Sequence, residues 1–148
     1  MLRRRFLAGL GASALAAPAL AAAGPAITVY KAWGCTCCDG WVTHLRRAGF
    51  RPQVVVVTDL SVEWRRRGVP DALSSCHMGV VQGYTIVGHV PMADLKRLLK
   101  ERPRAIGLSV PGMPDGSPGM ERADGKREPY DTLLLLPNGR SRVYARHA

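Results

Sequence analysis

The sequence predicts an α/β domain in which a βαβ unit is followed by a ββα unit. Two observations lead to this prediction. In the first half, two strand-like runs rich in β-branched and aromatic residues flank an amphipathic segment of helical period. In the second half, two strand-like runs are separated by a tight turn and followed by a second amphipathic segment.

The βαβ unit occupies the first half. Residues 27–33 (Ile-Thr-Val-Tyr-Lys-Ala-Trp) predict a strand, and residues 39–48 predict a helix whose apolar residues share one stripe and which ends at Gly49. The run Val54–Val57 is continuously apolar. It predicts a central strand that is covered on both faces and parallel to the first. Residues 61–67 predict a short helix.

The ββα unit follows. Residues 77–81 and 84–90 predict a hairpin around the tight turn Gln82-Gly83. A helix is predicted from Pro91, because proline suits the first turn of a helix. The residues expected to face the core from this helix are Met92, Leu95, Leu98 and Leu99.

The rest of the chain predicts an extension of the domain. Residues 107–119 are rich in proline and glycine, which predicts an irregular loop. Residues 132–136 and 141–145 predict a C-terminal β-hairpin around Pro137-Asn138-Gly139.

This order of elements is the thioredoxin-like arrangement, in which the loop that enters the third strand lies beside the N-terminus of the first helix. The sequence places Cys35, Cys37 and Cys38 at that helix N-terminus and Cys76 in that loop. We therefore expect the four cysteines to meet at one surface site, although Cys76 is distant in the sequence.

Residues 1–23 have the layout of a secretory signal peptide. A basic start at Arg3, Arg4 and Arg5 precedes an uncharged stretch rich in alanine and leucine, with small residues near its end. The basic start resembles a twin-arginine signal, and an ordinary export signal fits equally well. We expect residues 24–148 to form a single periplasmic domain with no membrane span.

The predicted exported domain is basic. It keeps eighteen of the 21 Lys and Arg residues and all 11 Asp and Glu residues, which gives a formal net charge of +7. Such a charge is compatible with nucleic acid or an anionic membrane as a partner. However, the basic residues are spread along the chain with few aromatic residues among them, and export argues against a nucleic-acid partner. We interpret most of them as solvated helix faces.

The cysteine pattern predicts metal chemistry. Thiols at a helix N-terminus are stabilised as thiolates by unpaired backbone N–H groups and by the helix dipole. Cu(I) prefers thiolate and thioether ligands, and one thiolate can bind two ions. Structural zinc also accepts four sulfurs, but the adjacent Cys37 and Cys38 make a single tetrahedron awkward. We therefore expect Cys35, Cys37, Cys38 and Cys76 to bind Cu(I), singly or as a small cluster.

Other interpretations remain open. Cys35 and Cys38 have the Cys-x-x-Cys spacing of thiol–disulfide oxidoreductases and form an alternative redox pair. Against this, Cys37 and Cys76 offer competing disulfides, and residues 75–77 hold the place where thioredoxins carry a cis-proline. Two structural disulfides are a third interpretation, although a domain of about 125 residues does not need them. A mixed function, in which the cluster cycles copper between oxidation states, is also open.

Three further residues are candidate ligands, namely His77, Met113 and Met120. His77 follows Cys76 directly, but alternation along an extended segment points its side chain away from that cysteine. A thioether from Met113 or Met120 could cap Cu(I), whereas a methionine under an irregular loop more often fills a gap.

Four other residues are expected to have structural roles. His44 lies about two helical turns from Cys37, which is too far for a shared metal ion. We expect His89 to be a hydrogen-bonded structural residue. Trp33 and Trp41 flank the thiols in the sequence, and we expect them to shield the site from water.

Short motifs occur in a fixed order between Ile27 and Glu121. They are Cys-Thr-Cys-Cys-Asp-Gly-Trp (35–41), His44-Leu45-Arg46, Gly49-Phe50, Gly68-Val69-Pro70, Ser75-Cys76-His77, Gly83-Tyr84, Gly88-His89-Val90-Pro91, Pro111-Gly112-Met113-Pro114 and Gly116-Ser117-Pro118-Gly119-Met120-Glu121. Together they resemble the CopG-like copper-resistance family, formerly labelled uncharacterised-domain family 411. Two features depart from the pattern: Met78 stands where a small polar residue is expected, and the segment from Asp131 onward carries no motif.

The resemblance implies a thioredoxin-like fold, export, and copper handling through the cysteine cluster. The expected function is copper sequestration outside the cytoplasm, with copper ions and other exported copper-handling proteins as partners. Sequestration would limit the redox toxicity of copper or prepare the ion for transfer.

Overall fold

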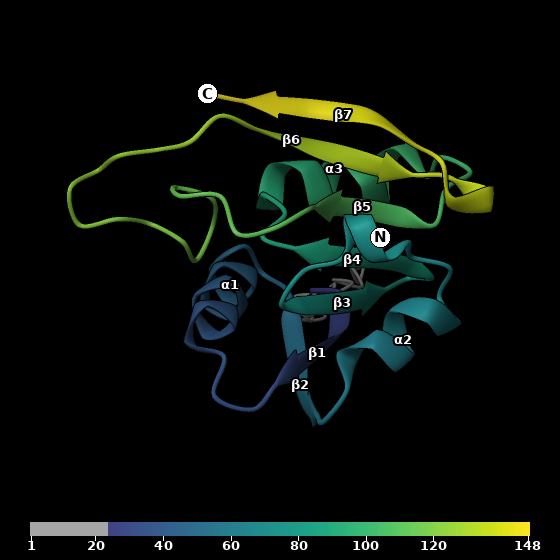
Figure 1. The fold of residues 1–148 in the computed structure, drawn as a ribbon, viewed down its shortest axis with the longest axis horizontal. Coiled ribbons are helices and arrows are strands. Elements are labelled where there is room, and N and C mark those ends of the chain that lie inside the picture. The colour runs from purple at the N-terminus through teal and green to yellow at the C-terminus, as the bar shows by residue number, and fades with distance from the viewer. Residues whose placement is uncertain (1–23) are drawn as a thin grey trace, which may run out of the picture.

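The predicted βαβ and ββα units lie in one continuous sheet. The computed structural model describes residues 24–148, and the signal peptide predicted for residues 1–23 lies outside the described part. The first unit consists of β1 (Ala26–Ala32), α1 (Thr36–Arg47) and β2 (Arg51–Val57), and α2 (Leu60–Arg66) follows it (Figure 1). β1 and β2 pair in parallel, as the sequence predicts.

The second unit is a hairpin followed by a helix. β3 (His77–Val81) and β4 (Tyr84–Gly88) pair antiparallel, and α3 (Met92–Glu101) follows. The two turn residues have positive φ angles, 47° at Gln82 and 86° at Gly83, which is the conformation of a tight two-residue hairpin turn. The hairpin prediction is therefore confirmed, including its turn.

The C-terminal extension continues the sheet. β5 (Gly107–Val110) pairs in parallel with β4, and β6 (Tyr130–Leu135) and β7 (Ser141–His147) form the predicted terminal hairpin. The seven strands lie in the order β2-β1-β3-β4-β5-β6-β7. The α/β prediction is thus confirmed, and the order of the first two units is compatible with a thioredoxin-like arrangement.

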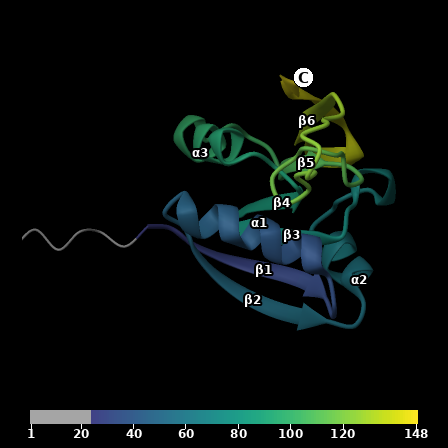
Figure 2. The same ribbon diagram turned by 90° about the vertical axis from the view of Figure 1, so that its left-hand side faces the viewer.

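Helices cover both faces of the sheet (Figure 2). The larger core cluster joins α1 and α3 to one face through Trp41, Leu45, Leu95 and Leu98, all fully buried. The smaller cluster joins α2 to the other face through Leu60. Among residues 24–148, no helix is long and apolar enough to cross a membrane.

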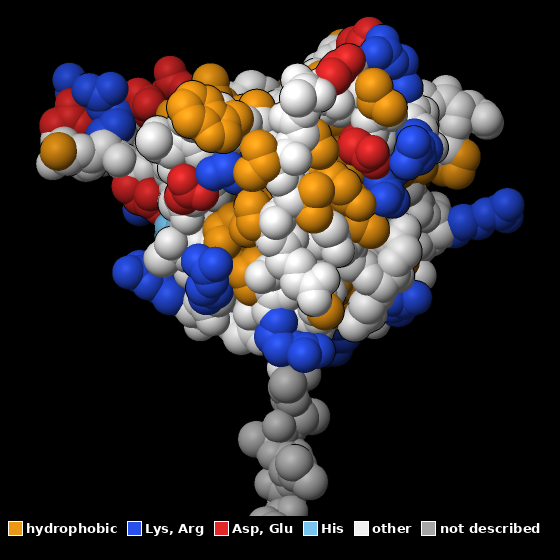
Figure 3. Space-filling model, turned by 90° about the horizontal axis from the view of Figure 1, so that it is seen from below, with side chains coloured by type: hydrophobic (Ala, Val, Ile, Leu, Met, Phe, Trp, Pro, Cys, Tyr) orange, Lys and Arg blue, Asp and Glu red, His pale blue; other side chains and the backbone are white. Residues whose placement is uncertain are grey.

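β2 differs from the prediction of a central, doubly covered strand. It forms the edge of the sheet, and Val54, Val55 and Val56 are 41%, 39% and 53% exposed. Figure 3 shows hydrophobic side chains gathered in the middle of the face seen from below, with charged side chains of both signs around them. The prediction is wrong because a continuous valine run satisfies strand propensity whether or not a neighbour covers it.

The predicted irregular loop begins later than expected. Residues 107–110 form β5, and all four are buried between β4 and β6. Gly107 is required there because a Cβ atom would lie 1.7 Å from the carbonyl oxygen of Thr85 on β4. Proline and glycine become frequent only from Pro111 onward. The loop prediction therefore wrongly included the four residues of β5.

Candidate metal centre

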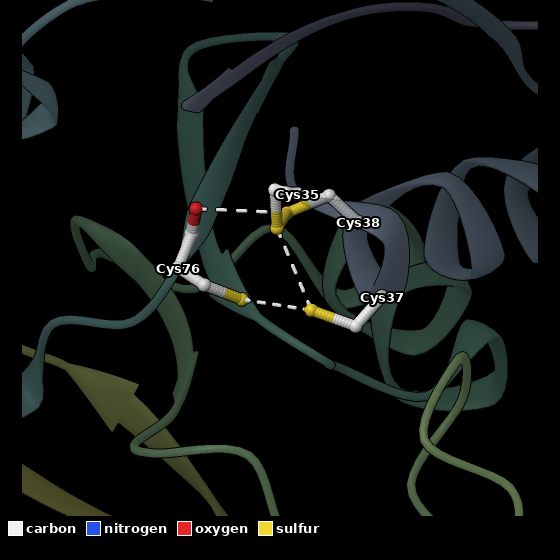
Figure 4. A group of neighbouring side chains, drawn as sticks. All are labelled: Cys35, Cys37, Cys38 and Cys76. Atoms are coloured by element: carbon white, nitrogen blue, oxygen red, sulfur yellow. Dashed lines mark hydrogen bonds between the residues drawn. A yellow bond between two sulfur atoms is a disulfide. The ribbon is translucent and has the colours of Figure 1, made fainter. Parts of the chain in front are cut away.

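The four cysteines meet because of the strand register. Cys35 is the N-cap residue of α1, so Cys37 and Cys38 lie in the first turn of that helix. β3 pairs antiparallel with β1, with His77 opposite Lys31. Cys76 immediately precedes β3 and therefore lies beside the C-terminal end of β1. The chain leaves that end of β1 to form α1. The expected convergence of the cysteines is observed (Figure 4).

The sulfur atoms form a compact cluster in which one pair is oxidised. The Sγ atoms of Cys35, Cys37, Cys38 and Cys76 all lie within 4.8 Å of one another. Cys35 and Cys38 are joined by a disulfide, and Cys37 and Cys76 are free. Cys37 Sγ lies 3.5 Å from Cys35 Sγ and 3.7 Å from Cys76 Sγ, so it is the central sulfur of the group. Such a cluster is positioned for metal binding.

Partial burial affects the chemistry of the free Cys76 thiol. Burial, followed by the neighbouring Cys37, raises the pKa of the Cys76 thiol to about 11. Cys76 therefore carries its proton at neutral pH. A soft metal ion that binds Cys76 has to displace this proton, and we expect proton release to accompany loading.

A buried lysine supports the loop that carries the cluster. The Lys31 side chain is only 9% exposed. Its Nζ donates a hydrogen bond of 3.1 Å to the carbonyl oxygen of Cys35 and forms an ion pair with Asp39 in the first turn of α1. The ammonium group thereby fixes the backbone at the start of the helix.

His77 lies at the site, contrary to the expectation that it points away from Cys76. Its Nδ1 is 3.3 Å from Cys76 Sγ, and the ring is fully buried. Regular alternation does not apply between the two residues because β3 begins only at His77. Trp41 covers the imidazole, with ring centroids 4.6 Å apart.

His89 is hydrogen-bonded, as expected, and it also lies beside Cys76. Its Nε2 lies 3.4 Å from Cys76 Sγ, while its Nδ1 donates a hydrogen bond of 2.9 Å to the carbonyl oxygen of Pro118. The β3–β4 register pairs Met78 with Val87, so residue 76 faces residue 89 two positions further on. The tight turn at Gln82-Gly83 fixes this register. The sequence therefore already indicated that residues 76 and 89 face each other, although we did not predict this contact.

Burial of the histidines makes the stability of the metal-free protein depend on pH. Burial, followed by the neighbouring His89, lowers the pKa of His77 to about 3, and burial also lowers the pKa of His89. The unfolded chain therefore binds protons first as the pH falls below about 6.5. Between there and pH 3, protonation of the unfolded chain at His77 is expected to lower the free energy of unfolding by on the order of 1 kcal/mol per pH unit.

Urea unfolding of the metal-free protein from pH 7 to pH 4 measures this slope. His77→Gln is expected to flatten it, whatever its effect on stability at pH 7. An unchanged slope in this variant would contradict the buried, neutral imidazole.

The loop after β5 closes one side of the site. Met113 Sδ lies 4.0 Å from Cys37 Sγ, and the Met113 side chain is 51% exposed. Ser75 Oγ donates to the carbonyl oxygen of Gly112 at 2.7 Å, next to Cys76. Met120 lies further along, where its N–H donates to the carbonyl oxygen of Ser117. Of the two predicted thioethers, Met113 is the one that contacts a cysteine.

Gly119 fixes this loop against α1. A Cβ atom at Gly119 would lie 2.6 Å from the backbone nitrogen of Trp41 and 2.9 Å from the carbonyl oxygen of Cys37. Gly119→Ala is therefore expected to lower the unfolding free energy by about 1–3 kcal/mol more than Gly125→Ala does. Gly125 is the matched control because it also has positive φ but has no atom within 4 Å of its Cβ position. Urea unfolding measures both, and equal effects would contradict the close packing.

The remaining predicted residues lie as follows. Trp33 is 88% exposed, so the expectation that it shields the thiols is wrong. Trp41 is fully buried and donates to the carbonyl oxygen of Val90. His44 pairs with Glu121 of the loop.

Comparisons with known proteins place these features in a family. A family model described as "Protein of unknown function, DUF411" matches residues 73–120. A solved structure described as "Copper resistance protein copG- Form 1" is 42% identical, with a TM-score of 0.78, covering 82% of this chain and 96% of the other. Another, "Copper resistance protein copG- Form 2", is 41% identical with a TM-score of 0.80, covering 84% and 99%. No match was found among curated proteins.

The similarity to the two solved structures spans nearly their whole length and includes the region of the cysteine cluster. The family expected from the sequence motifs is thereby confirmed. The chain belongs to the CopG-like copper-resistance family.

Proposed function

We propose that this protein binds Cu(I) through the thiolates of Cys35, Cys37, Cys38 and Cys76 and thereby contributes to copper resistance. The observation that carries this proposal is the approach of all four Sγ atoms to within 4.8 Å of one another. Thiolates are the preferred ligands of soft Cu(I), and bridging thiolates allow several ions in a small space. Met113 supplies a thioether at the exposed side of Cys37, where it could cap a copper ion.

Copper binding by all four cysteines requires the Cys35–Cys38 disulfide to be reduced. The same disulfide supports a redox role for the cluster. When Cys35 and Cys38 are oxidised, two thiols lose two electrons and two protons, and the electrons reduce two Cu(II) ions to Cu(I). The reverse reaction uses the disulfide to oxidise two Cu(I) ions. In this form of the proposal the cluster cycles copper between oxidation states as well as binding it.

The alternative is a thiol–disulfide oxidoreductase without copper, and the observed disulfide between Cys35 and Cys38 favours it. The central position of Cys37 argues against this alternative. Its sulfur is 3.5 Å from Cys35 Sγ, so it can attack the disulfide and scramble a single redox pair. A metal–thiolate cluster gains from the same proximity.

We place this function outside the cytoplasm, in the periplasm. The support is the signal-like layout of residues 1–23. Copper ions are the proposed cargo, and other exported copper-handling proteins are the proposed partners. Sequestration of copper would limit its toxicity, and transfer would deliver the copper ion to one of these partner proteins.

Two assays on one reduced, anaerobic sample separate copper binding from thiol–disulfide exchange. The first is a Cu(I) titration against a competing chelator, and the second is insulin reduction. We expect tight loading of Cu(I) with little reductase activity. Strong insulin reduction by a protein that does not bind Cu(I) would contradict the proposal and support the alternative.

A further inference from the structure

A second group of donor atoms shares Cys76 with the cysteine cluster. Cys76 Sγ, His77 and His89 each offer one ligand atom, and these three atoms lie within 4.8 Å of one another. The two sulfur–nitrogen distances are 3.3 Å and 3.4 Å. These values match the separation between two ligands of one ion when the metal–ligand bonds are about 2.0–2.3 Å long.

The His89 ring is oriented as a ligand. The carbonyl oxygen of Pro118 can only accept a hydrogen bond, so the contact of 2.9 Å identifies His89 Nδ1 as the donor. In a neutral imidazole Nε2 then carries a lone pair, and this lone pair faces Cys76 Sγ. A backbone carbonyl that holds the far nitrogen of a histidine is the usual support of a metal-ligating imidazole.

The buried His77 ring is incompletely hydrogen-bonded. The ring is fully buried, and its Nε2 has no hydrogen-bond partner. Its Nδ1 faces the same Cys76 sulfur as His89 does. Without a metal, the two contacts need the Cys76 S–H to donate to one ring and an N–H of the other ring to donate to the sulfur, whereas one metal ion accepts lone pairs from both rings and from the sulfur.

We propose that Cys76, His77 and His89 form a second copper position of mixed sulfur and nitrogen donors, which shares the Cys76 thiolate with the four-cysteine cluster. The inference rests on the proposed copper function and deepens it. The disulfide removes Cys35 and Cys38 as thiolate donors but leaves this second set complete. One thiolate and two imidazoles form a set that holds copper in both oxidation states. The protein can thus hold a copper ion at Cys76, His77 and His89 after oxidation of Cys35 and Cys38 has removed two of the four thiolates.

Co(II) tests this position in the full exported chain with the Cys35–Cys38 disulfide intact. Co(II) does not oxidise thiols or reduce the disulfide, and a site that binds Co(II) binds copper more tightly. We expect one Co(II) per chain, with sulfur-to-cobalt charge-transfer absorption. His77→Gln and His89→Gln are each expected to weaken binding at least about tenfold, and His147→Gln serves as the control because His147 contacts Asp94 and Thr132 instead.

The outcomes also separate this inference from the proposed function. Cu(I) titration of the reduced, unsubstituted chain tests the four-cysteine site separately, so its failure would sink the proposed function and not this inference. Urea unfolding of His89→Gln is expected to show a folded protein, so that weaker Co(II) binding reports the loss of a ligand. X-ray absorption at the cobalt edge detects imidazole ligands in the unsubstituted chain, so this measurement does not depend on how a variant folds. The inference is overturned if the disulfide form binds no Co(II), if the bound ion shows no imidazole, or if both histidine variants bind like the unsubstituted chain.

Discussion

Cys37→Ser is expected to abolish the binding of more than one Cu(I) ion per chain. Cys37 Sγ is the central sulfur, 3.5 Å from Cys35 Sγ and 3.7 Å from Cys76 Sγ. A serine oxygen is a hard donor that does not bridge soft Cu(I) ions. Loss of an outer-shell partner alone costs 10- to 100-fold in metal affinity, so loss of this direct ligand is expected to cost more than about 100-fold. Anaerobic titration against a Cu(I) chelator measures the affinity and the number of ions bound.

The matched control is Thr36→Ser, which changes the exposed residue beside Cys37 and removes no sulfur. Its Cu(I) loading is expected to equal that of the unsubstituted protein. Thiol counting on Cys37→Ser is expected to show that Cys35 and Cys38 still form their disulfide, because neither partner is altered. Full copper loading by Cys37→Ser would contradict the central role of this sulfur.

The largest loss of stability is expected from Trp41→Ala. Trp41 is fully buried between α1 and the sheet, and its Nε1 donates a hydrogen bond of 2.9 Å to the carbonyl oxygen of Val90. Truncation of a buried tryptophan to alanine costs about 3–5 kcal/mol. Since a domain of this kind is stable by only about 5–15 kcal/mol, the variant is expected to lose a large part of its stability in urea unfolding. Removal of the ring also uncovers His77.

Trp33→Ala is the control for this prediction. The same side chain is removed from a position that is 88% exposed, and surface substitutions usually change stability by less than about 0.5 kcal/mol. A small effect at Trp41, or similar effects at both positions, would contradict the packing described for α1.

The elements that carry the cysteines could be predicted from the sequence because local patterns determine them. The turn at Gln82-Gly83 fixes the β3–β4 register, and a helix after the first strand brings Cys37 beside Cys76. The same register also determines that His89 faces Cys76, so this contact was within reach of sequence reasoning. The contact was not predicted because His89 was interpreted by itself, as a structural histidine, and not in the register of the hairpin.

Other features depend on contacts that the sequence does not encode locally. A run of valines is compatible with both an edge strand and a central strand. Only the strand order shows that β2 lies at the edge of the sheet. β5 is four residues long, which is too short for periodicity to separate from the loop that follows. Trp33 precedes Gly34 and Cys35, and its exposure depends on how the chain leaves β1.

Copper X-ray absorption of the reduced, anaerobically Cu(I)-loaded protein tests the central claim most directly. If the four cysteines bind Cu(I) together, the first coordination shell is expected to consist mainly of sulfur, and copper–copper scattering is expected once more than one ion is bound. Cys76→Ser is expected to reduce the sulfur contribution, because this cysteine joins the cluster only through the fold. A shell of nitrogen and oxygen alone, or a sulfur contribution that does not change in Cys76→Ser, would contradict the account.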